Sequence, residues 1–494
     1  MICATVATLP PRISGRADSV TRGNAPVARP FGPSATLRIS PAGPDATCLR
    51  DAGIASAERA DQLAPLYRFN TSDSMRSILI AVLTTCLFLI PKVGNAQPAT
   101  DSGDIVAYVG GHVWNGSDFT DRTFYVRDGR FITEPARTDT TIQLEGGYVI
   151  PPFGDAHTHM LGAGGISLQL GENLFVPNGI FYGLDLTNPY SEIQEIRDEF
   201  EKTATIDVAY ANGGLTTTGV HPTAAMERRF TDTDEVTLQN LTLQGDAYWF
   251  MDTVADVKEK WPDYMSQRPD VVKVYLTYVA RGLEKNECYG LCPEVLQVVV
   301  NRAHEAGTRV FAHVNTNKDV QFALDAGIDA LAHLPSGNDG IGVSDEEFWL
   351  EGETIQRAGR DSVTLTPTAS LLVEDADPDT LQKEISRQRE QLRNLHEAGV
   401  RVALGADEWE KTALYEAMYL HEHKFFDNET LLKIWTETTP QAIFPDRKIG
   451  RLVQGYEASF LVLAENPLDK FEAVRSIQRG VKQGKTIIDR ASSN

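Results

Sequence analysis

Cysteine is scarce in this sequence. Its 494 residues contain five cysteines, of which only Cys288 and Cys292 lie beyond residue 96. No second pair follows them at the spacing of a zinc finger, so a cysteine-bound metal is the weaker interpretation. We expect a disulfide between these two residues, with two free thiols as the alternative, because the signal peptide described below implies an oxidising compartment.

Positive charge is also in short supply. Lys and Arg number 46 against 68 Asp and Glu, which gives a formal net charge of −22. A surface of this sign repels phosphates. We therefore expect no nucleic-acid partner and, on weaker grounds, no binding to an anionic membrane surface.

The N-terminal region lacks an apolar run long enough to span a bilayer. Its hydrophobic stretch covers residues 78–90, whereas a membrane-spanning helix needs about 20 residues. The stretch follows the basic Arg76 and precedes small residues at 94–96, which predicts a secretory signal peptide over residues 75–96. We therefore predict a periplasmic or secreted protein without a stable membrane anchor. Residues 1–74 show no lasting periodicity and are expected to be a non-native or disordered leader.

A Gly-rich phosphate-binding turn after a first strand is absent as well, which disfavours a doubly wound sheet. Instead, predicted strands and helices alternate from residue 151 to residue 446. Examples are strands at 179–187 and 270–278 and a helix at 378–398. This alternation indicates an α/β fold, a (β/α)8 barrel of the TIM type, with the doubly wound sheet as the alternative.

The two ends of the mature chain, residues 97–150 and 447–494, differ from the middle. Both contain short strands separated by turns with glycine, such as Asp128-Gly129. This pattern predicts a small β-sandwich domain formed from both ends of the mature chain.

Polar residues end several predicted barrel strands. His157 and His159 close the first strand, and the period of two places both on one face. Later strands are predicted to end at His221, His313, His333 and Asp407. Barrel enzymes place their chemistry at these strand ends, and imidazoles with a carboxylate are a typical donor set for a divalent metal. A second His-x-His pair, at 421 and 423, lies in a predicted helix, where such residues do not share a face, and we interpret it as a solvated helix surface.

Lys273 is unusual because it lies within an apolar strand, VVKVYL. The alternation of side chains points it inward, where an unpaired ammonium is costly, so it should lose its proton or find a partner. A neutral buried amine can add carbon dioxide. The resulting carbamate is an anionic ligand that can bridge two cations.

Taken in order, these motifs resemble those of the amidohydrolase superfamily, and within it the imidazolonepropionase-related and prolidase-like metal-dependent hydrolases. The resemblance runs from about residue 104 to residue 488 and includes VIPPFGDAHTH, DVVKVYL, RVFAHV, ALAHLP and VALGAD. It implies a centre of two divalent ions, with Zn²⁺ as the expected metal. One ion would be held by His157, His159 and Asp407, the other by His313 and His333, and carboxylated Lys273 would bridge them.

The resemblance also implies an activity, the hydrolysis of an amide bond in a dipeptide or an N-acyl amino acid. A hydroxide shared by the metals would attack the carbonyl, and Asp407 would pass a proton to the leaving amine. His221 would face the substrate, with hydrogen-bonded support of a ligand as the alternative role. The partner is thus a small-molecule or dipeptide-like substrate, and a homo-oligomer is left open.

Alternatives to this activity stay open from the sequence. Esters, lactones and cyclic amides suit the same chemistry. A mononuclear deaminase would not need Lys273. A metal-free binding protein is the alternative outside enzymes, although the sequence fills all six predicted ligand positions.

Overall fold

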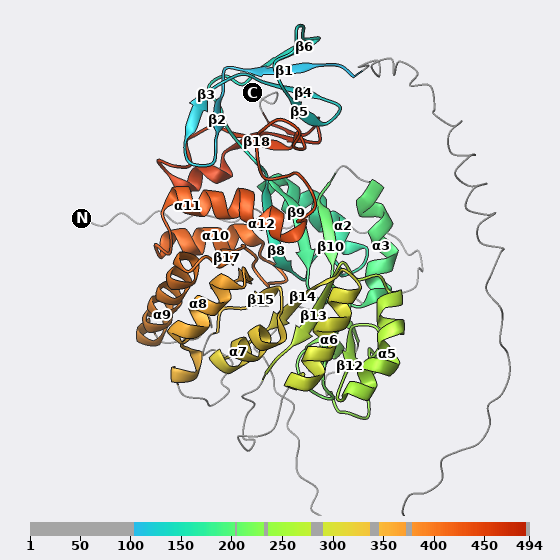
Figure 1. Cartoon of the computed structure of the whole chain (residues 1–494). Coiled ribbons are helices and arrows are strands. Elements are labelled where there is room, and N and C mark those ends of the chain that lie inside the picture. Colours follow the sequence, from blue (N-terminus) through green and yellow to red (C-terminus); the bar gives the residue numbers. More distant parts are fainter. Residues whose placement is uncertain are drawn as a thin grey trace, which may run out of the picture. The chain divides into compact units, whose positions relative to one another are not determined.

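Parallel strands separated by helices form the middle of the chain (Figure 1). The structure is a computed structural model that describes residues 103–202, 205–231, 236–277, 290–335, 345–371 and 378–490. The strands form a three-stranded sheet in the order β10-β9-β8 and a seven-stranded sheet in the order β12-β11-β13-β14-β15-β16-β17. Their bounds are β8 Phe153–Thr158, β9 Ile180–Asp185, β10 Asp207–Tyr210, β11 Gly214–Thr216, β12 Tyr248–Phe250, β13 Val271–Tyr275, β14 Arg309–His313, β15 Ala330–Ala332, β16 Thr364–Thr366 and β17 Arg401–Val402.

The two parallel sheets are connected in two places. Only residues 211–213 separate β10 from β11, which lie in different sheets. Beyond β17, Ala156 N of β8 donates to Leu404 O at 2.7 Å, and Asp407 N donates to His157 O at 2.8 Å. The chain that follows β17 is therefore a hydrogen-bonded neighbour of β8, which agrees with the predicted α/β class.

Helices alternate with these strands, and local sequence sets several of their ends. Thr253 and Thr316 form capping boxes with Asp256 and Asp319 at the starts of α5 and α7. The α-helices are α2 Ile166–Leu170, α3 Tyr190–Lys202, α4 Thr223–Phe230, α5 Val254–Ser266, α6 Pro293–Glu305, α7 Asn317–Ala326, α8 Gly352–Arg360, α9 Pro378–Glu397, α10 Ala413–Glu422, α11 Asn428–Lys433 and α12 Thr439–Ile443. Shorter turns are η1 Gly171–Phe175, η2 Val176–Asn178, η4 Asp345–Phe348, η5 Ile434–Thr438 and η6 Phe471–Arg475.

Strands from both ends of the described chain share one sheet. Its order is β20-β19-β18-β7-β2-β3, and a separate four-stranded sheet has the order β5-β4-β1-β6. These strands are β1 Val106–Val109, β2 His112–Trp114, β3 Phe119–Asp121, β4 Phe124–Arg127, β5 Arg130–Ile132, β6 Thr140–Gln143, β7 Tyr148–Ile150, β18 Phe460–Leu463, β19 Ile477–Lys482 and β20 Lys485–Asp489. Asp128 and Gly129, both at positive φ, turn β4 into β5, as the Asp-Gly pair predicts.

Aromatic rings connect these two β-sheets. Phe460 of β18 contacts Tyr108, Phe124 and Phe131 of the four-stranded sheet, with ring centroids 4.9, 5.2 and 6.2 Å away. All four side chains are buried. These large apolar rings pack the two β-sheets together, and they belong to the same hydrophobic cluster as the interior of the parallel sheets.

Several predicted boundaries can be compared with the structure. The predicted helix at 378–398 is α9, and the strands predicted at 179–187 and 270–278 are the shorter β9 and β13. The predicted leader, the signal peptide and Cys288 lie outside the described residues, and so does position 278. The disulfide with Cys292 therefore stays a prediction.

None of the helices that the structure describes is both long enough and apolar enough to cross a bilayer.

Candidate metal centre

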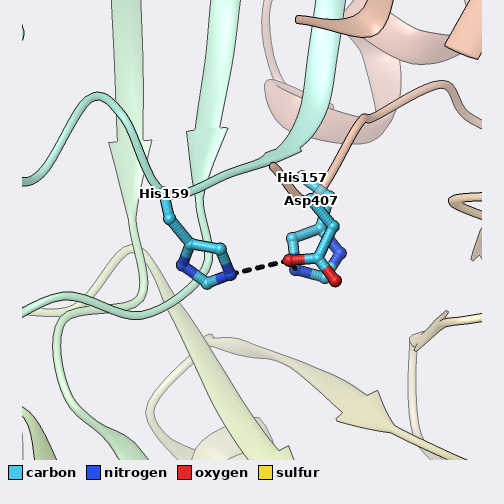
Figure 2. Close-up of side chains that lie close together, drawn as sticks. All are labelled: His157, His159 and Asp407. Carbon is cyan, nitrogen blue, oxygen red and sulfur yellow. Dashed lines mark hydrogen bonds and ion pairs between the residues drawn. The ribbon is translucent and has the colours of Figure 1, made fainter. Parts of the chain in front are cut away.

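Two histidines and one aspartate meet where β8 ends (Figure 2). His157 Nε2 lies 3.1 Å from Asp407 Oδ1, and His159 Nε2 lies 2.8 Å from the same oxygen. Among the described residues, these three side chains form a group whose potential ligand atoms lie within 4.8 Å of one another. The predicted shared face of the His-x-His pair is thus realised, with both imidazoles turned toward one carboxylate.

Backbone geometry brings Asp407 to this position. Its φ of 54° lies in the left-handed region, which is uncommon for a residue other than glycine. Two residues earlier, Gly405 packs so closely on β8 that a Cβ there would lie 2.4 Å from His157 N and 2.7 Å from His157 Cβ. Asp407 was predicted to end a strand, but β17 already ends at Val402. Beyond Val402, Ala403 N still donates to Leu365 O of β16 at 2.9 Å, and the chain then bonds to β8.

His313 and His333 continue the cluster from the neighbouring strands. His313 ends β14, as predicted, whereas His333 follows directly after β15, which ends at Ala332. His313 Nδ1 lies 3.0 Å from His333 Nε2, and His333 Nδ1 lies 3.3 Å from Asp407 Oδ2. The His333 ring also stacks on His157, with ring centroids 5.0 Å apart. Four imidazoles and one carboxylate therefore form a continuous set of metal-donor groups.

Lys273 lies in the interior beside this cluster. Its side chain is 1% exposed, and Nζ has no hydrogen-bond partner among the described residues. Burial lowers the pKa of Lys273 to about 8, although the charge of Asp407 acts in the opposite direction. Lys273 Nζ lies 5.4 Å from the centroid of the Tyr275 ring, and that ring meets the His313 ring at 5.3 Å. A buried, unpartnered amine next to metal-donor side chains fits the predicted carbamate bridge.

Three of the four imidazoles are held in the neutral form that binds metal ions. Burial lowers the pKa of His157 to about 4, and burial also holds the pKa of His313 and His333 well below the usual value. Burial acts in the same direction on His159, but the hydrogen bond to Asp407 and the charge of that carboxylate outweigh it and raise the pKa of His159. His159 Nδ1 donates to Thr187 O at 2.9 Å, so loss of the Nε2 proton would leave a lone pair on the side of Asp407. The donor set therefore suits a divalent cation such as Zn²⁺.

Residues that the sequence did not predict support the ligands. Thr368 Oγ1 shares a hydrogen bond of 2.7 Å with His333 Nδ1. Asp155 accepts from Ala413 N at 2.8 Å and from His157 N at 3.3 Å. Burial raises the pKa of Asp155 to about 7. The sequence could have indicated Thr368 as a supporting residue, because it comes just after β16 and the predicted ligands also follow strands. Nothing comparable distinguishes Asp155 from the other acidic residues, since the sequence contains 68 of them.

His221 lies beside the cluster, but not at the end of a strand as predicted. β11 ends at Thr216, and the chain then turns, with Gly219 at φ 76° and Thr216 Oγ1 donating to His221 O at 2.7 Å. The exposed His221 ring stacks on His313 at 5.0 Å and meets the Tyr275 ring at 5.2 Å. The turn therefore carries His221 to the cluster even though the strand stops early.

The pair His421 and His423 lies elsewhere, at the end of α10. His421 stacks on Phe471 at a centroid distance of 5.0 Å and lies 3.7 Å from Glu472. It was predicted as a solvated helix surface, and the structure corrects this to a partly buried packing contact.

Comparison with known proteins gives matches over most of the described chain. A model of the Amidohydrolase family matches residues 148–487. Ochratoxinase from Aspergillus niger is 28% identical over 207 residues, which are 39% of this chain and 41% of that relative. The match thus spans about two fifths of the length of the curated relative.

Solved structures resemble this chain over a larger part of its length. A Xaa-Pro dipeptidase with bound methionine in its active site has a TM-score of 0.61 at 16% identity, covering 78% of this chain and 99% of that one. Ochratoxinase from A. niger has a TM-score of 0.62 at 19% identity, covering 79% and 96%. A putative prolidase from Bifidobacterium longum has a TM-score of 0.60 at 19% identity, covering 78% and 94%. At these identities the likeness establishes the fold, a TIM-barrel-like α/β architecture.

Proposed function

Because this chain belongs to the amidohydrolase family, we propose that it is a metal-dependent hydrolase that cleaves an amide bond in a dipeptide or an N-acyl amino acid. The observation that carries the proposal is the convergence of His157, His159 and Asp407 at 2.8 and 3.1 Å, from positions 250 residues apart. His313, His333 and the unpartnered Lys273 extend the same site.

The architecture that we propose is a closed (β/α)8 barrel over residues 151–446. The hydrogen bonds from Ala156 and Asp407 to the opposite edge support closure. We further propose a β-sandwich formed by residues 97–150 and 447–494. The sheet that combines β7 with β18 and the ring contacts of Phe460 support that domain.

Two divalent ions, with Zn²⁺ as the expected metal, fit the donor set. His157, His159 and Asp407 would hold one ion, and His313 and His333 the other. Lys273, carboxylated, would bridge them, which removes the cost of a buried amine without a partner. When bound, such ions acidify water enough to supply hydroxide near neutral pH and polarise a carbonyl.

Side chains of this protein would transfer the proton of the attacking water and orient the substrate. Asp407, whose pKa is held well below its usual range by the neighbouring histidines despite its burial, is ionised and accepts the proton of the attacking water. It would deliver that proton to the leaving amine. His221, exposed beside His313, would contact the substrate carbonyl or carboxylate.

The substrate class rests on relatives. One curated relative is an ochratoxinase, and structural neighbours are a Xaa-Pro dipeptidase and a putative prolidase.

A periplasmic or secreted location follows from the predicted signal peptide at 75–96. The net charge of −22 supports a small-molecule partner over nucleic acid. A homo-oligomer is compatible with this location and with this kind of partner.

The test is hydrolysis by purified mature protein of a panel of dipeptides and N-acyl amino acids, with metal content measured by elemental analysis. We expect about two zinc ions per chain, activity against at least one amide class, and loss of that activity on chelation. Metal-loaded protein that cleaves no member of the panel, or protein that binds no divalent metal, would contradict the proposal.

A further inference from the structure

Thr368 contacts a predicted metal ligand from a strained backbone conformation. Its φ of 45° lies in the left-handed region, which is rare for a β-branched residue. The side chain is buried, and its Oγ1 lies 2.7 Å from Nδ1 of the His333 imidazole. Such conformations persist only where the surrounding structure holds them, and they cluster at functional sites. Contacts around residues 368–370 must therefore stabilise this turn.

A buried carboxylate supplies those contacts. Glu416 Oε1 accepts a hydrogen bond from Ala369 N at 2.9 Å, and Oε2 accepts one from Ser370 N at 2.8 Å. The Glu416 side chain is fully buried. The two backbone N–H groups that follow Thr368 thus point at one anion, as in other backbone sites for anions. Without this acceptor, two buried donors would be left unsatisfied, so the carboxylate and the turn depend on each other.

The helix that carries Glu416 is itself anchored to a strand of the metal centre. Ala413 N, in the first turn of α10, donates to Asp155 Oδ2 at 2.8 Å, and Asp155 Oδ1 accepts from His157 N at 3.3 Å. Glu416 follows Ala413 by three residues, about one helical turn. One turn of α10 therefore contacts both β8 and the segment after β16, which gives the carboxylate a fixed position.

The Thr368 hydroxyl determines how the His333 ring is used. His333 Nδ1 has two acceptors in reach, Thr368 Oγ1 at 2.7 Å and Asp407 Oδ2 at 3.3 Å. When Nδ1–H donates to the hydroxyl, the Nε2 lone pair is available for an ion, and Asp407 is free to hold the other ion. If the hydroxyl moved away, Nδ1–H would bond to Asp407 and compete with the metal for that carboxylate.

We propose that Glu416 is a positioning residue of the metal centre: its carboxylate holds Thr368 in the left-handed conformation, so that the hydroxyl keeps His333 oriented for metal binding. This inference rests on the proposed metal-dependent hydrolysis. Glu416 is not one of the predicted ligands and acts through the backbone and one hydroxyl. Its loss should therefore weaken binding of the ion assigned to His313 and His333.

Two measurements at pH 8 report on this role. Burial raises the pKa of Glu416 to about 7, and the hydrogen bonds from Ser370 and Ala369 oppose that rise, so the carboxylate is mainly ionised at pH 8. The affinity of the second zinc ion is measured by competition with a chromophoric chelator. The Nδ1–H proton of His333 is followed by ¹⁵N-histidine NMR of the chelated protein, with its resonance assigned from a His333→Gln variant.

Glu416→Gln keeps the size of the side chain but places an amide where one N–H needs an acceptor. We expect the second zinc ion to bind roughly 10-fold more weakly and the His333 Nδ1–H to exchange with water roughly 10-fold faster. Glu416→Asp keeps the charge and withdraws it from residues 369 and 370. It should change both quantities in the same direction, and it decides the matter if Glu416→Gln does not fold.

A double-mutant cycle tests the route through Thr368. Thr368→Val keeps the shape of the side chain and removes the hydroxyl, so it should weaken the second zinc ion at least as much as Glu416→Gln does. The double variant should then be no weaker than Thr368→Val alone, and Thr368→Ser, which retains the hydroxyl, should bind zinc as the parent does. Additive effects of the two substitutions would show that Glu416 does not act through Thr368.

Glu227→Gln is the matched control. Glu227 is also a buried helical carboxylate that accepts from two consecutive N–H groups, Thr242 N at 2.6 Å and Leu243 N at 2.8 Å. These groups belong to a segment that carries no predicted ligand. The substitution should lower the free energy of unfolding as Glu416→Gln does, but it should leave the second zinc ion and the His333 proton unchanged.

The outcomes distinguish this inference from the proposed function. If the parent protein binds no zinc or cleaves no amide, but the His333 proton depends on Glu416 and Thr368, the hydrolase proposal is wrong and the positioning role stands. If Glu416→Gln and Glu416→Asp lose stability as Glu227→Gln does, with the His333 proton and the second zinc ion as in the parent, the assignment of Glu416 is overturned.

Discussion

Asp407 combines an uncommon backbone conformation with three imidazole neighbours. The φ of 54° is held by the hydrogen bond from its own N–H to His157 O at 2.8 Å, so strand β8 determines where the carboxylate lies. Oδ1 faces His157 and His159, and Oδ2 faces His333 at 3.3 Å. A single carboxylate in contact with three donors can both bind a cation and exchange a proton.

Asp407→Asn keeps this shape and removes the charge. We expect unchanged circular dichroism, most of the metal retained, and a kcat lower by roughly 10²- to 10⁴-fold, because the amide cannot accept the proton. Glu408→Gln is the matched control, since the partly buried Glu408 pairs with Lys411 and not with the histidine cluster, and it should keep kcat within about twofold. An Asp407→Asn protein with normal kcat would remove Asp407 from proton transfer.

Lys273 and Lys482 are both buried lysines, but only one has partners. Lys482 donates to Asp207 and to Thr205 O, whereas Lys273 Nζ has no hydrogen-bond partner among the described residues. Burial lowers the pKa of Lys273 to about 8, so a sizeable fraction is neutral amine near that pH and able to add carbon dioxide.

Lys273→Met should therefore lower the zinc content from about two ions per chain to one or fewer, because the bridging ligand is lost. After equilibration with ¹³C-bicarbonate, a carbamate resonance should appear in the parent protein and be absent from the variant. Lys482→Met should retain both the resonance and the zinc. A resonance that survives in Lys273→Met would place the carbamate on another lysine.

At the scale of elements, the segment after β17 has no regular secondary structure up to Asp407, yet its backbone packs tightly against β8. Gly405 approaches the backbone of β8 so closely that neither side can give way easily. β8 carries two of the predicted ligands, so a shift at this contact moves both His157 and His159 relative to Asp407.

Gly405→Ala should lower the free energy of unfolding by about 1–3 kcal/mol, the usual cost of overpacking a core, and should reduce zinc occupancy. Urea denaturation of the chelated protein measures the first effect and elemental analysis the second. Gly352→Ala, at the start of α8 with open space around the added methyl, is the control and should be neutral within about 0.5 kcal/mol. Equal stability of the two variants would show that the close approach to His157 is absent.

The elements that the sequence predicted well are those in which local pattern and tertiary packing agree. β14, with His313 at its end, and the helix α9 follow their hydrophobic periodicity. β11 stops before His221, where Gly219 at φ 76° turns the chain, and β17 stops at Val402, after which Leu404 O and Asp407 N bond to β8. The first difference follows from a local turn at a glycine, and the second is accompanied by contacts with a distant segment, which periodicity does not contain.

At the scale of the whole molecule, parallel strands bring to one place residues spread from position 157 to position 407. The sequence could indicate His157, His159, His313, His333 and Asp407 because each follows an apolar strand. It could not indicate the stacking of Trp409 on His159, since that contact depends on how the segment after β17 folds toward β8. Thr187, which orients His159, lies after β9 without a motif of its own.

The change in Tm on removal of the metal tests whether these distant residues form one metal centre. The donor groups include three imidazoles whose pKa is lowered by burial and one ionised carboxylate, so a cation should bind the folded state far more tightly than the unfolded chain. Binding at a thousand times the dissociation constant stabilises a fold by about 4 kcal/mol, so chelation should lower Tm by roughly 5–15 °C and added zinc should restore it.

Two variants give that measurement its controls. His313→Asn removes one predicted ligand of the second ion, so zinc should restore only part of its Tm and bind at about one ion per chain. His304→Asn changes a surface histidine that lies 2.9 Å from Asp329, and it should respond to chelation and zinc as the parent does. A parent protein whose Tm is unaffected by chelation and by zinc has no metal centre that depends on the fold, and the hydrolase proposal would fail with it.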